Sequence, residues 1–187
     1  MPMPLEFTRA GRDAAIRQAA GICAAYADAY GVRADDRKVS AFRNRLARAV
    51  KRPGFEVALA GRGPDVAGFA FGYPLPGDDT YWWAGLRPEP PEGFTAETGS
   101  RTFVLAEIEV RKEHQGGGVG RQLHDLLLGS RHEQRATLAV NPGAETPHEI
   151  YQHWGWSLAG QVPGSSGDYF DAYDLFVLEL QGQDTRA

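Results

Sequence analysis

The chain has 187 residues, of which 42% are hydrophobic and 24% charged, and a formal net charge of −4. This composition is that of an ordinary soluble globular protein of one domain, residues 1–187, and the acidic balance argues against a dedicated nucleic-acid binder. No apolar run approaches the ~20 residues that span a bilayer, and the single cysteine excludes an intrachain disulfide framework. We therefore expect a cytoplasmic protein with no membrane partner and with nucleic acid an unlikely one.

Two helical patterns come first along the chain. Apolar residues recur at helical spacing over about 12–30 and about 35–51. Cys23 falls in the apolar stripe of the first helix, so we interpret it as a core residue. The second helix carries seven lysines and arginines between Arg37 and Arg52. We interpret most of them as a solvated face, and a docking patch for an acidic partner is the alternative.

Two short strand patterns follow, at 55–61 and 65–73, and a turn between them predicts a hairpin. From 74 to 101 the periodicity disappears, and the segment is acidic and contains three consecutive aromatic residues, Tyr81, Trp82 and Trp83. A loop of this length inside a compact domain usually has a function.

Residues 102–110 form the clearest strand pattern. Glu107 and Glu109 fall on one face of it together with Phe103 and Leu105. A helix is predicted over 118–130 and a short buried strand over 136–141.

A last helix is predicted from the capping pattern at its start. Thr146 suits the N-cap, Pro147 the first helical position and Glu149 the capping box, while Gly155 suits the end. Two further strands complete the order α-α-β-β-β-α-β-α-β-β. This order predicts an α/β fold with a mixed sheet covered by helices.

The junction between the strand at 102–110 and its helix is rich in glycine. The first N–H groups of a helix have no intrahelical partner, and glycines let a bulky anion approach the backbone closely. Gly116, Gly117, Gly118 and Gly120 supply that freedom, and Arg121 can add a guanidinium. The stretch lacks the Gly-Lys-Ser/Thr ending of a P-loop and the spacing of a dinucleotide fingerprint. The residues alone therefore predict a site for a pyrophosphate-like anion, with a simple strand–helix connector as the alternative.

Two motifs together resemble the GNAT superfamily of acyl-CoA-dependent N-acetyltransferases. Gln115 to Gly120 fits the Gln/Arg-x-x-Gly-x-Gly/Ala signature of that family, and Ile150 to Trp156 resembles its second motif, a Tyr four residues before a Gly-aromatic pair. The resemblance is firm over 102–158. It departs at Ala144, where the family often has an asparagine that contacts the pantetheine arm; the nearest asparagine is Asn141.

This resemblance implies a mostly antiparallel twisted sheet that is splayed between the strands at 102–110 and 136–141. It also implies acetyl-CoA as cosubstrate. The cofactor-binding residues would be Val110, whose N–H would stabilise the oxyanion, together with Gln115, Gly116, Gly117, Gly118, Val119, Gly120, Arg121 and Asn141.

The chemistry of acyl transfer suggests three catalytic candidates. The acceptor amine must lose a proton and the departing thiolate must gain one. The resemblance gives Tyr151 the second role, with aromatic packing as the alternative. Glu107 or Glu109 could relay the amine proton, with salt bridges to Arg101, Arg111 or Lys112 as the alternative. We expect His114 and His124 to face solvent and expect no metal site.

The 74–101 segment stands where the family varies its acceptor site. Its acids and the aromatic residues Tyr81, Trp82 and Trp83 suit an organic cation. We therefore expect acetyl transfer to a primary amine of a small cationic acceptor by direct attack in a ternary complex. The alternatives are a non-catalytic acyl-CoA-binding module, and acetylation of a protein or peptide amine or of aminoacyl-tRNA. A homodimer paired through the C-terminal strands is also possible.

Overall fold

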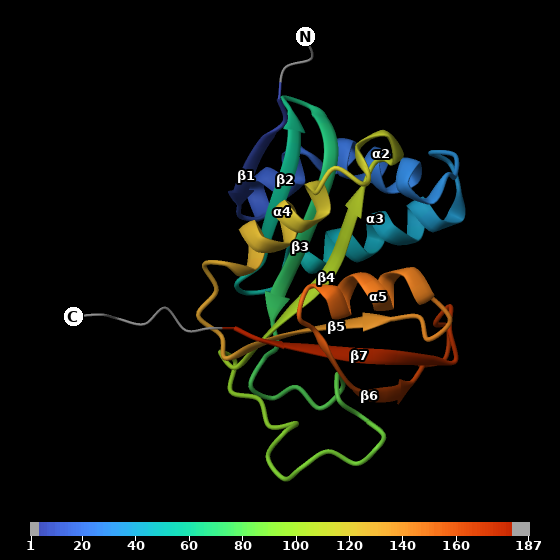
Figure 1. The fold of residues 1–187 in the computed structure, drawn as a ribbon. Coiled ribbons are helices and arrows are strands. Elements are labelled where there is room, and N and C mark those ends of the chain that lie inside the picture. Colours follow the sequence, from blue (N-terminus) through green and yellow to red (C-terminus); the bar gives the residue numbers. More distant parts are fainter. Residues whose placement is uncertain (1–3, 181–187) are drawn as a thin grey trace, which may run out of the picture. The chain divides into compact units, whose positions relative to one another are not determined.

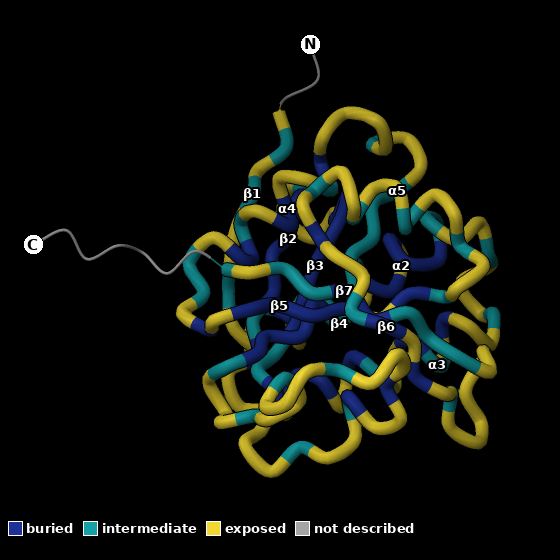
Figure 2. Tube along the Cα trace, turned by 60° about the horizontal axis from the view of Figure 1, so that its bottom comes forward, coloured by how far each residue is buried: buried dark blue, intermediate teal, exposed yellow. Residues whose placement is uncertain are grey.

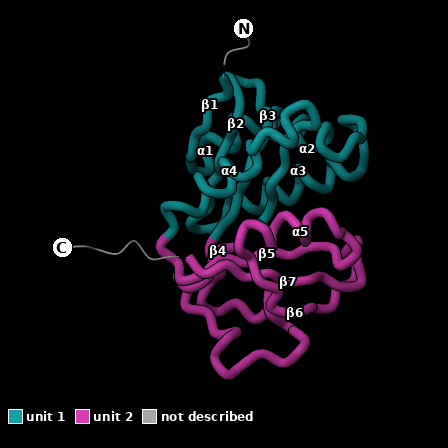
Figure 3. Tube along the Cα trace, viewed as in Figure 1, with its two compact units in different colours: residues 1–73, 105–131 teal, residues 74–104, 132–187 magenta. Residues whose placement is uncertain are grey.

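The computed structural model describes residues 4–180 (Figure 1). The chain divides into two compact units (Figure 3), which are residues 1–73 with 105–131 and residues 74–104 with 132–187. Strand β4 (Thr102–Val110) has residues in both units. The order of the seven strands is β1-β2-β3-β4-β5-β7-β6, and the pairing of β4 with β5 is parallel. The predicted fold class, a mixed and mostly antiparallel sheet with flanking helices, is confirmed.

The first unit contains a meander of three antiparallel strands, β1 (Glu6–Ala10), β2 (Glu56–Arg62) and β3 (Asp65–Pro74). The register places large residues opposite large ones, as in Val57 with Phe71, and small ones opposite small ones, as in Ala60 with Gly68. Because side chains alternate between the faces of a strand, one face of the sheet is bulky and the other is nearly flat. Most of β2 and β3 is buried (Figure 2).

Helices cover both faces of this meander. The bulky face forms one hydrophobic core with α1 (Arg12–Arg17), α2 (Ala19–Tyr30) and α3 (Arg37–Ala49). The flat face lies toward α4 (Val119–Leu128), which packs on β1 and β2. A Cβ added at Gly68 would lie 3.1 Å from the Leu123 side chain, so the small residues allow α4 to approach closely.

The second unit is built on β5 (Arg135–Val140), β6 (Ser157–Pro163) and β7 (Ala172–Glu179), with β7 antiparallel to both neighbours. Helix α5 (Glu145–His153) connects β5 to β6. The pairing of β4 with β5 joins residues 102–104 to residues 135–137, at the start of both strands. The segment 74–101 belongs to this unit, where Arg87 forms an antiparallel bridge with Gln161 on the edge strand β6.

Three local predictions were wrong. The strand β1 was missed, and the expected helix over 12–30 is two helices that meet at Gln18. Helix α5 begins at Glu145 after an N-cap at Ala144 that offers no side-chain bond, so neither Thr146 nor Glu149 forms the expected capping box. Pro147 still lies in the first turn, where its missing N–H costs no helical hydrogen bond.

Candidate active site

The glycine loop connects the end of β4 to the start of α4. After Val110 the chain makes one short 3-10 turn, η1 (Lys112–His114), and then passes through Gly116 at φ +76° and Gly118 at φ +81°. Residues with a side chain rarely adopt such left-handed values. A Cβ added at either glycine would meet no atom within 4 Å. The glycines are therefore required by the backbone path, and the space beside them is open.

Gly118 is also the N-cap of α4, and no side chain caps the helix there. The first N–H groups of a helix have no carbonyl one turn back and carry the positive end of the helix dipole. The N–H groups of Val119, Gly120 and Arg121 lie in this first turn. The loop thus places backbone donors and an open approach at one point, which is the geometry that a diphosphate requires.

Two side chains fix the ends of the loop. The Gln115 amide donates to the Val110 carbonyl at 2.9 Å, which ties the loop back to the last residue of β4. The Arg121 guanidinium donates to Asp125 at 2.9 Å, one turn along α4, and remains about half exposed. Arg121 is therefore oriented along the helix.

Glu107 and Glu109 extend from β4 toward side chains of α2 and α3. The Arg45 guanidinium lies 3.6 Å from the Glu107 carboxylate and contacts the Tyr26 hydroxyl at 3.5 Å. The Tyr30 hydroxyl hydrogen-bonds to Glu109. The acid pair thus lies near two phenol groups and the guanidinium of Arg45.

Burial dominates the ionisation of both acids. It raises the pKa of Glu107 to about 7, although the charge of Arg45 opposes the shift. Burial and the neighbouring Glu107 raise the pKa of Glu109 to about 8, against the hydrogen bond from Tyr30. The two carboxyl groups therefore exchange protons near neutral pH, which is the range that a general base needs.

Glu107 pairs with a residue other than Arg101, Arg111 or Lys112, the partners considered from the sequence. Arg111 donates instead to the Val66 carbonyl at 2.7 Å, and Arg101 donates to the carbonyls of residues 93 and 96. The partner is Arg45, which belongs to the basic helix α3 whose charges were interpreted as mostly solvated.

The three aromatic residues of the 74–101 segment have different environments. Tyr81 is 69% exposed, and its hydroxyl hydrogen-bonds to that of Ser165. Trp82 is partly buried and donates from its indole to Thr137 at 3.1 Å. Trp83 is buried, and the Arg135 guanidinium lies 4.9 Å from its ring centre. The face of Trp83 already binds a cation of the chain itself, whereas Tyr81 is accessible.

A buried ion pair anchors this segment. Arg135, only 2% exposed, contacts the Glu97 carboxylate at 3.0 Å and donates to the Phe94 carbonyl at 2.6 Å. Glu97 also accepts hydrogen bonds from the Trp83 indole and from Thr102. The segment 74–101 is thus fixed to β4 and β5 by charge as well as by packing.

The residues of the second motif lie in the second unit. Tyr151 is half-buried, with its ring edge-on to Trp154 at 5.9 Å and to Trp156 at 6.0 Å. The Asn141 side-chain oxygen accepts from the Gly143 N–H at 3.0 Å and so closes a turn after β5.

One histidine contradicts the sequence interpretation, and another has a partner that was not foreseen. His124 is 3% exposed and lies 2.8 Å from the Asp125 carboxylate, so the expectation that it faces solvent was wrong. His148 pairs with Asp174 on β7 at 2.8 Å, which no spacing in the sequence indicated. Among residues 4–180 no group of histidine, cysteine or acidic side chains could hold a metal ion. No helix in the same range is long and apolar enough to cross a membrane.

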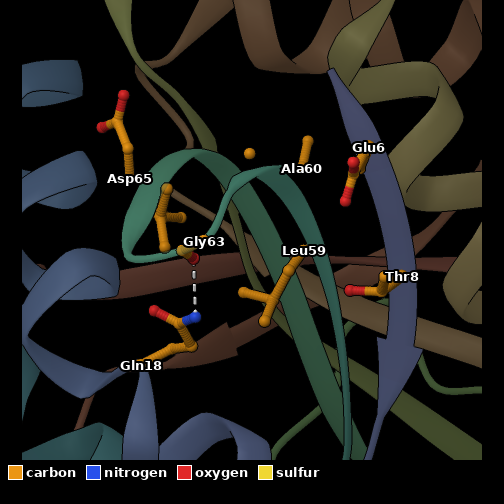
Figure 4. Close-up of a pocket in the computed structure, with 9 residues that line it drawn as sticks. Glu6, Thr8, Gln18, Leu59, Ala60, Gly63 and Asp65 are labelled. Atoms are coloured by element: carbon orange, nitrogen blue, oxygen red, sulfur yellow. Dashed lines mark hydrogen bonds between the residues drawn. The ribbon is translucent and has the colours of Figure 1, made fainter. Parts of the chain in front are cut away.

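The first unit contains a cavity of about 210 Å³ between β1, β2, the start of β3 and the junction of α1 with α2. Figure 4 shows the residues that line it. The Gln18 amide donates to the Gly63 carbonyl at its edge, at 2.8 Å. Its lining consists of Glu6, Thr8, Gln18, Leu59, Ala60, Gly61, Gly63, Asp65 and Val66. None of the residues expected in the site contributes to it.

Comparison with known proteins gives the following likenesses. No protein-family model matches the chain. The 5-NmdU N-acetyltransferase of Pseudomonas phage PaMx11 is 33% identical over 64 residues, which are 34% of this chain and 46% of that protein. The matched part thus spans about half the length of this relative.

Solved structures resemble most of the chain. A protein from Desulfovibrio desulfuricans assigned to the GNAT acetyltransferase family has a TM-score of 0.64 and 16% identity, over 94% of this chain and 99% of its own. An aminoglycoside 6'-acetyltransferase type Ii has a TM-score of 0.64 and 13% identity, over 94% and 97%. A GNAT acetyltransferase from Elizabethkingia anophelis with acetyl-CoA bound has a TM-score of 0.52 and 15% identity, over 73% and 82%.

These likenesses confirm the family resemblance inferred from the two motifs. At identities of 13–16% the solved structures show the fold alone. This chain has the fold of the GNAT acetyltransferases.

Proposed function

We propose that this chain transfers an acetyl group from acetyl-CoA to the primary amine of a small organic cation, by direct attack in a ternary complex. The open glycine loop at the start of α4 carries the proposal. Its left-handed glycines and the N–H groups of the first turn of α4 suit the diphosphate of coenzyme A. The acetyl-CoA bound to the Elizabethkingia anophelis protein supports the same cosubstrate.

Direct attack is favoured because the chain lacks a suitable thiol for an acyl-enzyme. Its only cysteine, Cys23, is 4% exposed in the core beside α3. Burial raises the pKa of this thiol, which disfavours the thiolate that a nucleophile requires.

Glu109 is the better of the two candidate bases. Glu107 is held by Arg45, whereas Glu109 has a neutral phenol as hydrogen-bond partner. An alkylammonium loses its proton reluctantly near neutral pH. A carboxylate with a pKa of about 8 is therefore a useful acceptor for that proton, directly or through water.

The remaining roles follow the family resemblance. The Val110 N–H would stabilise the oxyanion of the tetrahedral intermediate. Tyr151 would protonate the departing thiolate, and its half-buried position among aromatic rings agrees with a phenol kept in a defined orientation.

The charge around the acids supports a cationic acceptor. Glu107, Glu109 and Arg45 together carry a net negative charge when both acids are ionised, and the rings of Tyr26 and Tyr30 are nearby. The names of two similar proteins, an aminoglycoside 6'-acetyltransferase and a 5-NmdU N-acetyltransferase, also refer to N-acetylation or to an amino-sugar acceptor class.

A panel of acceptors tests this function. Thiol release from acetyl-CoA would be followed with polyamines, aminoglycosides, 5-NmdU, a peptide with a free N-terminus and a neutral alcohol as control. We expect turnover with at least one cationic amine and none with the alcohol. Binding of acetyl-CoA without turnover on any amine would favour a non-catalytic module.

A further inference from the structure

Helix α5 carries Tyr151 but has little of its own to hold it in place. None of its residues is buried, and its N-cap Ala144 provides no side-chain bond. Pro147 in the first turn lacks an N–H. A helix of this kind depends on specific contacts made by a few side chains.

His148 makes two such contacts. Its Nδ1 lies 2.6 Å from the Ala144 carbonyl oxygen, and its Nε2 lies 2.8 Å from the Asp174 carboxylate on β7. Both neighbours are acceptors, so both ring nitrogens must carry hydrogen to satisfy them. The geometry therefore requires the doubly protonated ring.

Neighbouring residues hold both members of this ion pair in position. The second oxygen of Asp174 accepts from the Gln161 amide of β6 at 2.9 Å. The His148 ring is edge-on to Phe176 at 5.3 Å, and the Tyr151 ring tilts against the same Phe176 at 6.4 Å. One face of β7 thus holds His148 through charge and Tyr151 through packing, one helical turn apart.

We propose that His148 is a positioning residue. As an imidazolium it attaches α5 to Asp174 of β7, and this attachment fixes the position of Tyr151. This attachment of α5 does not depend on the proposed function, whereas its effect on turnover rests on the proposed role of Tyr151. His148 lies in the first turns of α5, where the helix dipole disfavours a cation. Asp174 supplies the compensating negative charge.

The ion pair between His148 and Asp174 depends on pH in a defined direction. Burial lowers the pKa of His148, but the hydrogen bonds to Asp174 and to the Ala144 carbonyl outweigh it and raise the pKa above its ordinary value. Asp174 is the titratable group that acts on it, and Gln161 and Phe176 are neutral. Because folding raises this pKa, the contribution is complete at low pH and is lost as the pH rises through the folded value.

His148→Gln, Asp174→Asn and His153→Gln test the inference, the last as a matched control because His153 is exposed on the same helix. ¹⁵N NMR should show His148 titrating above the ordinary value of a histidine side chain, and Asp174→Asn should lower its pKa. Amide exchange of residues 149–153 should accelerate at least about tenfold in His148→Gln and stay unchanged in His153→Gln. With an accepted amine, His148→Gln should lower kcat with little change in the KM for acetyl-CoA.

The outcomes separate the two ideas. Unchanged amide exchange in His148→Gln, or a His148 that titrates at or below the ordinary value of a histidine side chain, overturns the proposed attachment of α5, whatever the activity. Faster amide exchange in His148→Gln, when the unaltered protein turns over no amine, supports the attachment of α5 and contradicts the proposed function. Faster exchange with an unchanged kcat contradicts the link to Tyr151.

Discussion

The Arg45 guanidinium lies 3.6 Å from the Glu107 carboxylate, across from β4 on helix α3. It also lies 5.6 Å from the centre of the Phe42 ring and 6.0 Å from that of Tyr26, so two aromatic rings hold it in place. This cation makes the two neighbouring acids unequal. Glu107 has a charged partner, and Glu109 two residues on depends on the Tyr30 phenol.

Replacement of the acids should separate their roles. We expect Glu109→Gln to lower kcat/KM for the amine by about 10²-fold, in the range of general-base contributions. Glu107→Gln should have a smaller effect. In the unaltered protein kcat/KM should rise with pH through the region of 7 to 8, where both acids lose their protons. A pH–rate profile of the three proteins measures this, and equal profiles would contradict the assignment.

Arg45→Met should destabilise the fold in a pH-dependent way. Folding raises the pKa of Glu107 from its ordinary 4.5 to about 7, so ionisation of this group reduces stability as the pH rises between those values. Without Arg45 the buried carboxylate loses its partner, and we expect a loss of about 1–3 kcal/mol at pH 8. The loss should be smaller at pH 5, where the acid is protonated in the folded chain.

Urea unfolding at the two pH values measures this effect. Arg48→Met is the matched control, because Arg48 is exposed on the same helix and should change stability little at either pH. An equal loss for Arg45→Met at both pH values would show that the guanidinium acts by packing alone.

The glycine loop offers a second matched pair. Gly118→Ala forces a side chain onto φ +81°, which we expect to cost about 1–2 kcal/mol of backbone strain and to weaken acetyl-CoA binding. Gly117 does not have a positive φ, and a Cβ there would meet only the His114 carbonyl, at 3.9 Å. Gly117→Ala should therefore fold normally. Thermal melts with and without acetyl-CoA compare the two, and equal ligand-induced shifts in Tm would argue against a backbone anion site.

Tyr151→Phe removes one hydroxyl and keeps the aromatic contacts with Trp154 and Trp156. If this phenol protonates the thiolate, kcat should fall by about 10²-fold or more while stability changes by less than about 1 kcal/mol. Thiol-release kinetics at saturating acetyl-CoA give kcat. A value within twofold of the unaltered protein would restrict Tyr151 to packing.

The sequence predicted the elements whose local pattern is strong. Residues 102–110 are an apolar run in which Glu107 and Glu109 share one face; they form β4, and the glycines after them lead into α4. Strand β1 was missed because it is a short edge strand with mostly exposed residues and no alternation. The helix breaks at Gln18, whose amide donates to the carbonyl of Gly63, far along the chain, a contact that no local pattern indicates.

The glycine loop of the candidate site could be predicted, because backbone conformation determines which residues it needs. The ion pairs could not, because their partners lie far apart in the sequence. The loop residues follow from the conformational freedom of glycine. The partners Arg45 for Glu107 and Asp174 for His148 are joined only by the folded sheet and helices. Several other cations and acids were equally plausible partners in the sequence. The contact of Trp83 with Arg135 could not be predicted for the same reason, since only the folded chain brings these two residues together.

Calorimetric titration with acetyl-CoA and with S-acetylpantetheine, which lacks the diphosphate, tests the role of the glycine loop most directly. The account predicts that acetyl-CoA binds with one molecule per chain and that S-acetylpantetheine binds at least about 10²-fold more weakly, because charge-assisted contacts to the diphosphate are lost. No heat of binding with acetyl-CoA, or equal affinity for the two compounds, would contradict it.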